Sequence, residues 1–161
     1  MSRYVFDIES DDLLLGITRM WMLFAVNIDT RERHLFIGDD TRWKQLFDNA
    51  TLLVGHNIAG FDLPALKKLY GWVRPRNCKI RDTLLLSEIL DYQRFKKRGH
   101  SLGEWGNFLN YPKGDFTDYK GPAEGETVIE WLERMRIYCE QDVDLNLEVY
   151  QSLMSELGAK V

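Results

Sequence analysis

Residues 3–9 read RYVFDIE, and this stretch decides the fold because it joins a strand pattern to two acids. Aromatic and β-branched residues alternate along Arg3–Ile8, which is typical of a β-strand. Residues two apart on a strand point to the same face, so Asp7 and Glu9 project together while Ile8 points into the core. Two carboxylates on one face are costly unless a cation lies between them, and a divalent metal ion is the obvious candidate. The alternative is a pair of solvent-facing acids at a strand end.

Strand and helix patterns alternate along the rest of the chain. The first part predicts a three-stranded meander, with strands at Arg3–Ile8, at Met20–Ile28 as a central strand, and at His34–Ile37. The later part predicts a short helix capped by Thr41, strands at Thr51–Val54 and Cys78–Ile80, helices at Asp62–Tyr70, from Asp82, at His100–Leu109 and at Glu126–Leu157, and a loop at 110–125. The last helix is either one long helix or two with a bend. Together these elements predict a single α/β domain with a mixed sheet over residues 1–161.

The composition is that of one folded domain of 161 residues. Hydrophobic residues make up 45% and charged residues 29%, which excludes a disordered chain. No apolar run approaches the roughly 18 residues of a membrane span, and the early first strand leaves no room for a signal peptide. Cys78 and Cys139 lie far apart, which excludes a sequence-readable zinc cluster or disulfide framework and favours a reducing compartment. We therefore expect a cytoplasmic protein without a membrane partner.

The formal net charge of −4 argues against a protein that coats nucleic acid nonspecifically. The charge is unevenly spread, because residues 67–98 hold ten basic and three acidic residues while the remainder is strongly acidic. A phosphate backbone would be attracted to such a basic stretch. A solvated loop and helix face explains the same pattern, and from charge alone this simpler interpretation is favoured.

Two further segments carry acids next to structural signals. Residues 55–62 read GHNIAGFD, a glycine-rich loop that delivers Asp62 to the start of a helix, where it is either a functional acid or an N-cap. Residues 138–142 read YCEQD, and on a helix Tyr138 and Asp142 share one face. A metal-binding carboxylate beside a phenol that orients a water fits this spacing. The alternative is a core tyrosine beside a surface aspartate, which is common on an amphipathic helix.

The order of these motifs resembles a nuclease superfamily. Asp-x-Glu on a first strand, then Asn-x-x-x-Phe-Asp, then Tyr-x-x-x-Asp on a C-terminal helix are similar to the DEDD 3′→5′ exonucleases, in the tyrosine-containing DEDDy subgroup. The greatest similarity is to the proofreading exonuclease domain of bacteriophage family A DNA polymerases, and it extends from Tyr4 to about Leu153, with further matching segments at 77–84 and 100–106. The resemblance implies an RNase H-like (DnaQ-like) fold, with a mixed five-stranded sheet flanked by helices.

The resemblance also implies the site and its cofactors. Four carboxylates, those of Asp7, Glu9, Asp62 and Asp142, would hold two divalent cations, Mg²⁺ or Mn²⁺. Carboxylate oxygens suit these hard cations. The metal ions would activate a water and stabilise the leaving 3′ oxygen, Tyr138 would orient that water, and the products would be nucleoside 5′-monophosphates.

Substrate contacts are implied by the same resemblance. Leu13 corresponds to an apolar wedge between the last bases, or else it is a buried residue of the Leu13–Leu15 run. Asn57 and Phe61 would line the terminal nucleotide, and His56 would either approach the scissile phosphate or make a loop contact. Four basic residues would track the strand backbone: Arg94, Lys96, Lys97 and Arg98. The nearby acids Asp11 and Asp12 are expected to be solvent-exposed, and Asp82 to cap a helix.

The function that follows is a 3′→5′ exonuclease that prefers single-stranded DNA, in a prokaryotic or phage-infected cell. The chain stops 19 residues past Asp142, so we expect a stand-alone nuclease and not a polymerase, acting alone or with a separate polymerase. Two alternatives are an enzyme that trims RNA 3′ ends and a binding module with a decayed site. The presence of all four carboxylates and Tyr138 argues against decay.

Overall fold

The computed structural model describes residues 2–158, which form one five-stranded mixed sheet. Its strands are β1 (Ser2–Ser10), β2 (Met20–Asn27), β3 (Arg33–Ile37), β4 (Ala50–Gly55) and β5 (Lys79–Asp82), in the order β3-β2-β1-β4-β5. β2 runs antiparallel to β1 and β3, whereas β4 runs parallel to β1 and β5. The predicted α/β fold class is confirmed. The prediction that the strand from Met20 is central is confirmed, because β2 lies inside the sheet between β3 and β1 and is almost fully buried; β1 occupies the middle position.

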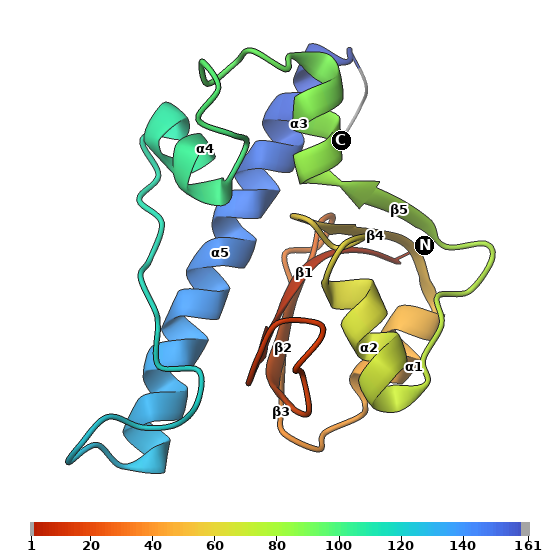
Figure 1. Cartoon of the computed structure of the whole chain (residues 1–161). Coiled ribbons are helices and arrows are strands. Elements are labelled where there is room, and N and C mark those ends of the chain that lie inside the picture. The colour runs from red at the N-terminus through yellow and green to blue at the C-terminus, as the bar shows by residue number, and fades with distance from the viewer. Residues whose placement is uncertain (1, 159–161) are drawn as a thin grey trace.

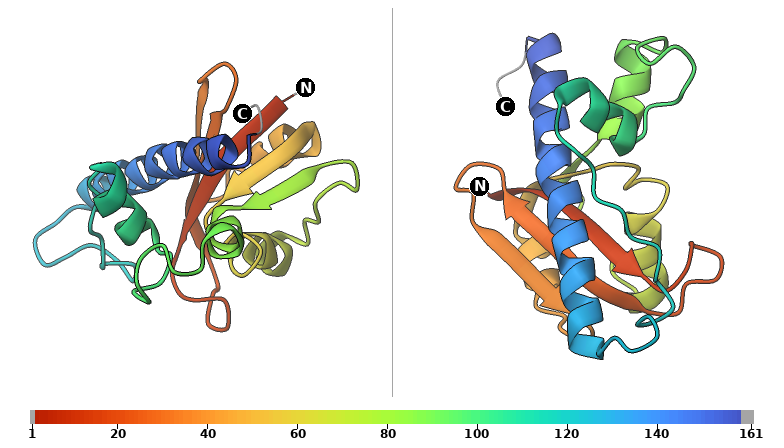
Figure 2. Two further views of the ribbon diagram at one scale, coloured as in Figure 1. Left: turned by 90° about the horizontal axis from the view of Figure 1, so that it is seen from above. Right: turned by 90° about the vertical axis from the view of Figure 1, so that its left-hand side faces the viewer.

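Five helices flank the sheet: α1 (Trp43–Asp48), α2 (Asp62–Tyr70), α3 (Thr83–Leu90), α4 (Leu102–Leu109) and α5 (Val128–Glu156). α1 and α2 cover one face, while α5 crosses the other face with α3 and α4 beside it (Figures 1 and 2). α5 is a single helix of 29 residues, which decides between the two alternatives for the C-terminal segment. Arg42, and not the expected Thr41, occupies the N-cap position of α1. None of the helices within residues 2–158 is both long and apolar enough to cross a membrane.

The alternation along β1 divides the core between the two faces. Tyr4, Phe6 and Ile8 pack in the cluster that includes α1 and α2. Val5 packs in the other cluster, which is built with α4 and α5. Because Asp7 and Glu9 follow Val5 at intervals of two residues, they belong to the face that α5 crosses. The central strand therefore carries its two acids toward the long C-terminal helix.

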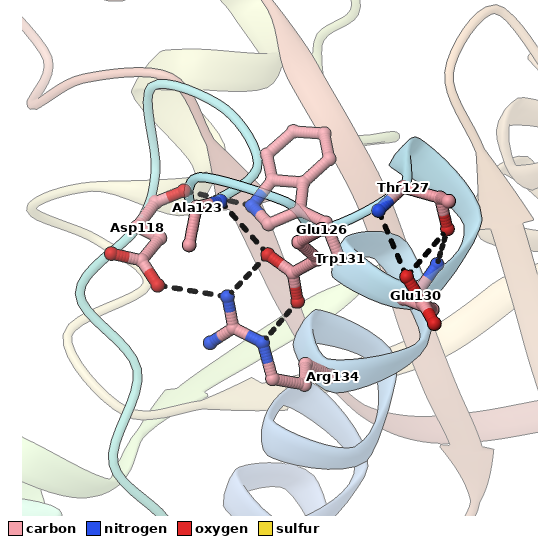
Figure 3. Close-up of polar contacts among 7 residues, drawn as sticks. All are labelled: Asp118, Ala123, Glu126, Thr127, Glu130, Trp131 and Arg134. Atoms are coloured by element: carbon pink, nitrogen blue, oxygen red, sulfur yellow. Dashed lines mark hydrogen bonds and ion pairs between the residues drawn. The ribbon is translucent and has the colours of Figure 1, made fainter.

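The segment between α4 and α5 is irregular, as expected, but it is fastened to the start of α5 (Figure 3). Thr127 and Glu130 form a capping box that satisfies the first backbone N–H groups of the helix. Arg134 pairs with both Asp118 and Glu126. The indole of Trp131 donates to the Asp118 carbonyl at 2.8 Å. These contacts hold the segment in place along α5.

Candidate active site

The first acid pair lies at the end of β1 on the face toward α5. Glu9 is buried and Asp7 partly buried, and Ile8 between them packs on the opposite face. Cys139 on α5 lies 4.0 Å from Asp7 Oδ2, measured from its Sγ. The prediction that both acids share a face is confirmed, whereas the alternative of two solvent-facing acids was wrong because α5 covers this face.

Asp62 reaches the same place from the other side of β1. Pairing between β1 and β4 ends at Val5 and Val54, so the later N–H groups on that edge of β1 need other partners. The Asp62 carboxylate accepts the Ile8 N–H at 3.1 Å. Phe61 occupies the N-cap position of α2, so the alternative that Asp62 is the N-cap was wrong.

Asp82 holds the loop that leads to Asp62. Its carboxylate accepts the N–H of Leu84 at 3.0 Å and caps α3, as the sequence predicted. It also accepts the N–H groups of Asn57 at 2.9 Å and Ala59 at 3.0 Å. Asp82 therefore holds the 56–61 loop in its conformation, and its carboxylate oxygens are occupied by backbone N–H donors.

The third acid comes from α5. Tyr138 and Asp142 share one face of the helix, and Asp142 is 6% exposed. Both contact Lys113, which follows α4: its Nζ lies 2.9 Å from Asp142 Oδ2 and 2.6 Å from the Tyr138 hydroxyl. The ammonium also lies over the Tyr138 ring, 4.5 Å from the centroid. The alternative of a core tyrosine beside a surface aspartate was wrong for Asp142, because its carboxylate is buried.

Crowding of these acids raises their pKa values. Burial and then Asp142 raise the pKa of Asp7 to about 7. Burial, followed by Asp7, raises the pKa of Glu9 and of Asp62 well above the usual range. Burial also raises the pKa of Asp142, while Lys113 opposes that change. A cluster of this kind gains stability from any cation that binds among its oxygens.

The donor set fits hard divalent cations. Glu9 Oε1 and Asp142 Oδ1 are buried and have no hydrogen-bond partner among the described residues. Asp7, Glu9 and Cys139 each offer a ligand atom within 4.8 Å of the others. Burial and the nearby acids raise the pKa of the Cys139 thiol well above its usual value, so this group stays protonated and is a poor ligand. The carboxylates of Asp7, Glu9, Asp62 and Asp142 are the better set for Mg²⁺ or Mn²⁺.

A groove of about 530 Å³ opens over the acids. It is lined by acids, aromatic side chains and two lysines: Asp7, Glu9, Asp11, Asp12, Leu13, His56, Phe61, Lys113, Thr117, Tyr119, Lys120, Tyr138 and Asp142, with Ile8, Ser10 and Leu102. Leu13 is 76% exposed at this groove, so the alternative that it is a buried residue was wrong. Asn57 is exposed and lies outside the groove lining.

His56 both lines the groove and makes a loop contact. Its Nδ1 lies 2.9 Å from Thr83 Oγ1, which in turn donates to Asn146 Oδ1 at 2.6 Å. Burial lowers the pKa of His56 to about 4, so its ring is neutral at pH 7. Of the two nearby acids, Asp12 is exposed as expected, and Asp11 is partly buried because it binds the N–H groups of Thr18 and Arg19.

The basic residues named by the sequence lie elsewhere. Arg94 is paired with Glu156 at 2.6 Å and lies over the Trp105 ring, with only 10% of its side chain exposed. Lys96, Lys97 and Arg98 are exposed on the segment between α3 and α4, outside the groove lining. The cations beside the acids are instead Lys113 and Lys120. Sequence patterns missed both, because irregular segments carry no periodicity that shows where a side chain points.

The sequence matches no protein-family model and no curated protein. Its similarity to solved structures, in contrast, covers nearly the whole chain. A structure described as the apo form of the nuclease has a TM-score of 0.69 and 14% identity, over 96% of this chain and 72% of that chain. NrnC of Brucella melitensis bound to pGG has a TM-score of 0.68 and 16% identity, over 97% of this chain and 73% of that chain. The Phi29 DNA polymerase complexed with single-stranded DNA has a TM-score of 0.61 and 15% identity, over 99% of this chain and 32% of that chain.

At these identities the similarity establishes the fold. The mixed five-stranded sheet with flanking helices is the RNase H-like fold that these nuclease and polymerase structures share. The fold that the sequence motifs implied is therefore confirmed.

Proposed function

We propose that this protein is a metal-dependent 3′→5′ exonuclease that releases nucleoside 5′-monophosphates from single-stranded DNA. One observation carries the proposal: acids from β1 and α5 line one groove, with two of their oxygens buried and without a partner among residues 2–158, and Asp62 at the start of α2 is bonded to β1 close to them, buried outside the groove lining. A folded protein rarely leaves buried carboxylate oxygens unsatisfied unless a ligand completes them. The shared fold with known nucleases supports the same activity.

Asp7, Glu9, Asp62 and Asp142 would hold two divalent cations. When bound, these cations would supply an activated water and offset charge on the leaving 3′ oxygen. Tyr138 would orient the water from beside Asp142. Because burial and Asp142 raise the pKa of Tyr138, the phenol keeps its proton and acts through hydrogen bonds and not as a base.

The groove walls suit the end of a single strand. Leu13 is exposed at the groove and would pack against the last bases, while Phe61 would stack on the terminal base. The neutral ring of His56 would offer a hydrogen bond and no charge. The structural neighbours with bound ligands contain pGG in NrnC and single-stranded DNA in the Phi29 polymerase, which supports a strand with free bases.

The test is incubation of a 5′-labelled single-stranded oligonucleotide with the protein and Mg²⁺ or Mn²⁺, as DNA and as RNA. We expect a ladder of products shortened from the 3′ end, abolished by EDTA, with DNA degraded faster. Faster degradation of RNA would replace the DNA preference with an RNA-trimming function. Intact substrate with every metal would contradict the proposal.

Asp142→Asn and Asp144→Asn form a matched pair for this assay. Both changes remove one carboxylate from α5, but Asp144 pairs with Arg33 at 2.9 Å and lies outside the groove. We expect Asp142→Asn to abolish the ladder and Asp144→Asn to retain it. If Asp142→Asn is as active as Asp144→Asn, Asp142 is not part of the active site.

A further inference from the structure

Lys113 places an ammonium group inside the acid cluster. Its Nζ donates to the Tyr138 hydroxyl at 2.6 Å and pairs with Asp142 Oδ2 at 2.9 Å. Its side chain is only 28% exposed, which sets this pair apart from ordinary surface salt bridges. Lys113 also lowers the pKa of Asp7, so its charge acts on more than one acid.

Two glycines bring the backbone around Lys113 close to the neighbouring helices. A Cβ at Gly106 on α4 would lie 2.6 Å from the Tyr111 carbonyl oxygen and 3.5 Å from the backbone nitrogen of Lys113. A Cβ at Gly114 would lie 3.2 Å from Tyr138 Cδ2 and would clash with the Gln141 amide. The segment is therefore packed tightly between α4 and α5 at Lys113, and its far end is fastened to α5 (Figure 3).

The position of this ammonium conflicts with a cation bound to the same oxygen. A Mg²⁺ ion lies about 2.1 Å from a carboxylate oxygen. With Lys113 Nζ at 2.9 Å from Asp142 Oδ2, a cation on that oxygen would lie within about 5 Å of the ammonium, and a cation on the unpartnered Oδ1 would share the same carboxylate with it. The two positive groups would repel each other in a partly buried site, where electrostatic interactions are stronger than in water.

We propose that Lys113 is a positioning residue that acts as an internal counter-cation: it holds Asp142 and Tyr138 in place until a divalent cation binds, and then leaves Asp142. The inference rests on the proposed metal site and adds that the Lys113 ammonium and the divalent cation compete for Asp142. Competition is reciprocal, so removal of the ammonium strengthens metal binding and metal binding releases the ammonium.

The first test measures Mn²⁺ binding to the full chain by electron paramagnetic resonance, without nucleic acid. We expect Lys113→Met to bind Mn²⁺ about 5- to 50-fold more tightly than the wild type. Lys120→Met is the matched control, because Lys120 lines the same groove but pairs with Asp12 at 2.7 Å. It removes the same charge from the same segment, and we expect its affinity to stay close to that of the wild type. Equal affinity of Lys113→Met and the wild type would overturn the inference.

The second test separates displacement from simple repulsion. Acetic anhydride labelling followed by mass spectrometry reports how accessible each lysine is, and Lys79, exposed on β5, serves as the internal standard. We expect Mn²⁺ to increase the labelling of Lys113 several-fold relative to Lys79. Unchanged labelling with saturating Mn²⁺ would show that the ammonium stays on Asp142, which overturns the proposed release.

Folding and the metal site are checked separately. The Tm of Lys113→Met without metal is expected to fall below that of the wild type, and saturating Mn²⁺ is expected to remove the difference. Weak Mn²⁺ binding that Asp142→Asn leaves unchanged would contradict the proposed metal site itself. Normal binding that Asp142→Asn weakens, with Lys113→Met equal to wild type, would contradict the counter-cation alone.

Discussion

Two of the four proposed metal ligands, Asp62 and Asp142, are held in place by defined contacts. Asp62 is fixed by the Ile8 N–H, and Asp142 by Lys113. Nearby acids are already engaged: Asp82 by three backbone N–H groups and Asp12 by Lys120. If one of the four proposed ligands is replaced, we therefore expect no neighbouring acid to substitute for it at the metal site.

Asp62→Asn tests whether the carboxylate that is bonded to the edge of β1 is needed for activity. The amide oxygen can still accept the Ile8 N–H, so the fold should persist. Because a ligand is lost, we expect the rate to fall by more than about 100-fold, beyond the effect of residues that only support a ligand. Tyr138→Phe should cost less, about 10- to 100-fold, because the four carboxylates remain. Initial rates, with circular dichroism as the folding control, check both, and near-normal activity of Asp62→Asn would contradict this assignment.

The raised pKa of Asp7 predicts a pH-dependent response to metal. The usual pKa of this group is 3.8 and in the fold it is about 7, so its protonated form contributes stability below about pH 4 that is lost as pH rises through about 7. A bound cation offsets the resulting repulsion. The increase in Tm caused by Mn²⁺ should therefore grow between about pH 5.5 and pH 8. Thermal unfolding with and without Mn²⁺ measures this increase in Tm, and Asp7→Asn should make the increase less dependent on pH. An increase in Tm that does not change with pH in the wild type would contradict this role of Asp7.

Sequence reasoning succeeded where a residue's position follows from its element. The strand period placed Asp7 and Glu9 on one face, and the helix period placed Tyr138 with Asp142, as the structure has them. It could not locate Lys113 or Lys120, because tertiary contacts decide where an irregular segment lies. It also assigned Arg94 to the substrate, whereas Glu156 and Trp105 hold that side chain within the fold.

At the scale of elements, the contact between α4 and the segment after it depends on Gly106. An alanine Cβ there would lie 2.6 Å from a backbone oxygen of Tyr111, so one of the two must move. We expect Gly106→Ala to destabilise the fold by about 1–3 kcal/mol. On the same helix, a Cβ at Gly103 would lie 3.6 Å from Ser101 Oγ, an ordinary contact distance. Gly103→Ala should therefore stabilise the fold by up to about 1 kcal/mol. Urea unfolding of both variants measures the difference, and equal stability would contradict the close approach.

The elements themselves were largely predictable. Apolar periodicity gave every strand and helix of the described chain, with bounds shifted by a few residues. The meander of the first three strands is confirmed, but the places of β4 and β5 in the sheet were not predicted, because the chain pattern shows which segments are extended and not which distant segments pair. β1 became central only through its parallel pairing with β4, a contact across 49 residues at Tyr4 and Leu53.

At the scale of the whole molecule, two exposed lysines lie apart from the groove that the acids line. Lys96 and Lys97 are exposed on the segment between α3 and α4, outside the lining of that groove. If this segment guides a longer strand, replacing both lysines by alanine should weaken binding several-fold at low salt and little at high salt. Arg42→Ala with Lys44→Ala, at α1 on the opposite face, is the control of equal charge. Fluorescence anisotropy with single-stranded DNA measures both, and equal affinities would leave the basic segment without this role.

The proposed site brings four carboxylates from three separate parts of the chain together around divalent cations. Anomalous diffraction from crystals soaked in Mn²⁺ tests it most directly. We predict two neighbouring anomalous peaks among the carboxylates of Asp7, Glu9, Asp62 and Asp142, with Lys113 moved away from Asp142. Peaks that lie elsewhere, or none at these carboxylates under saturating Mn²⁺, would show that these four acids do not form a cation site.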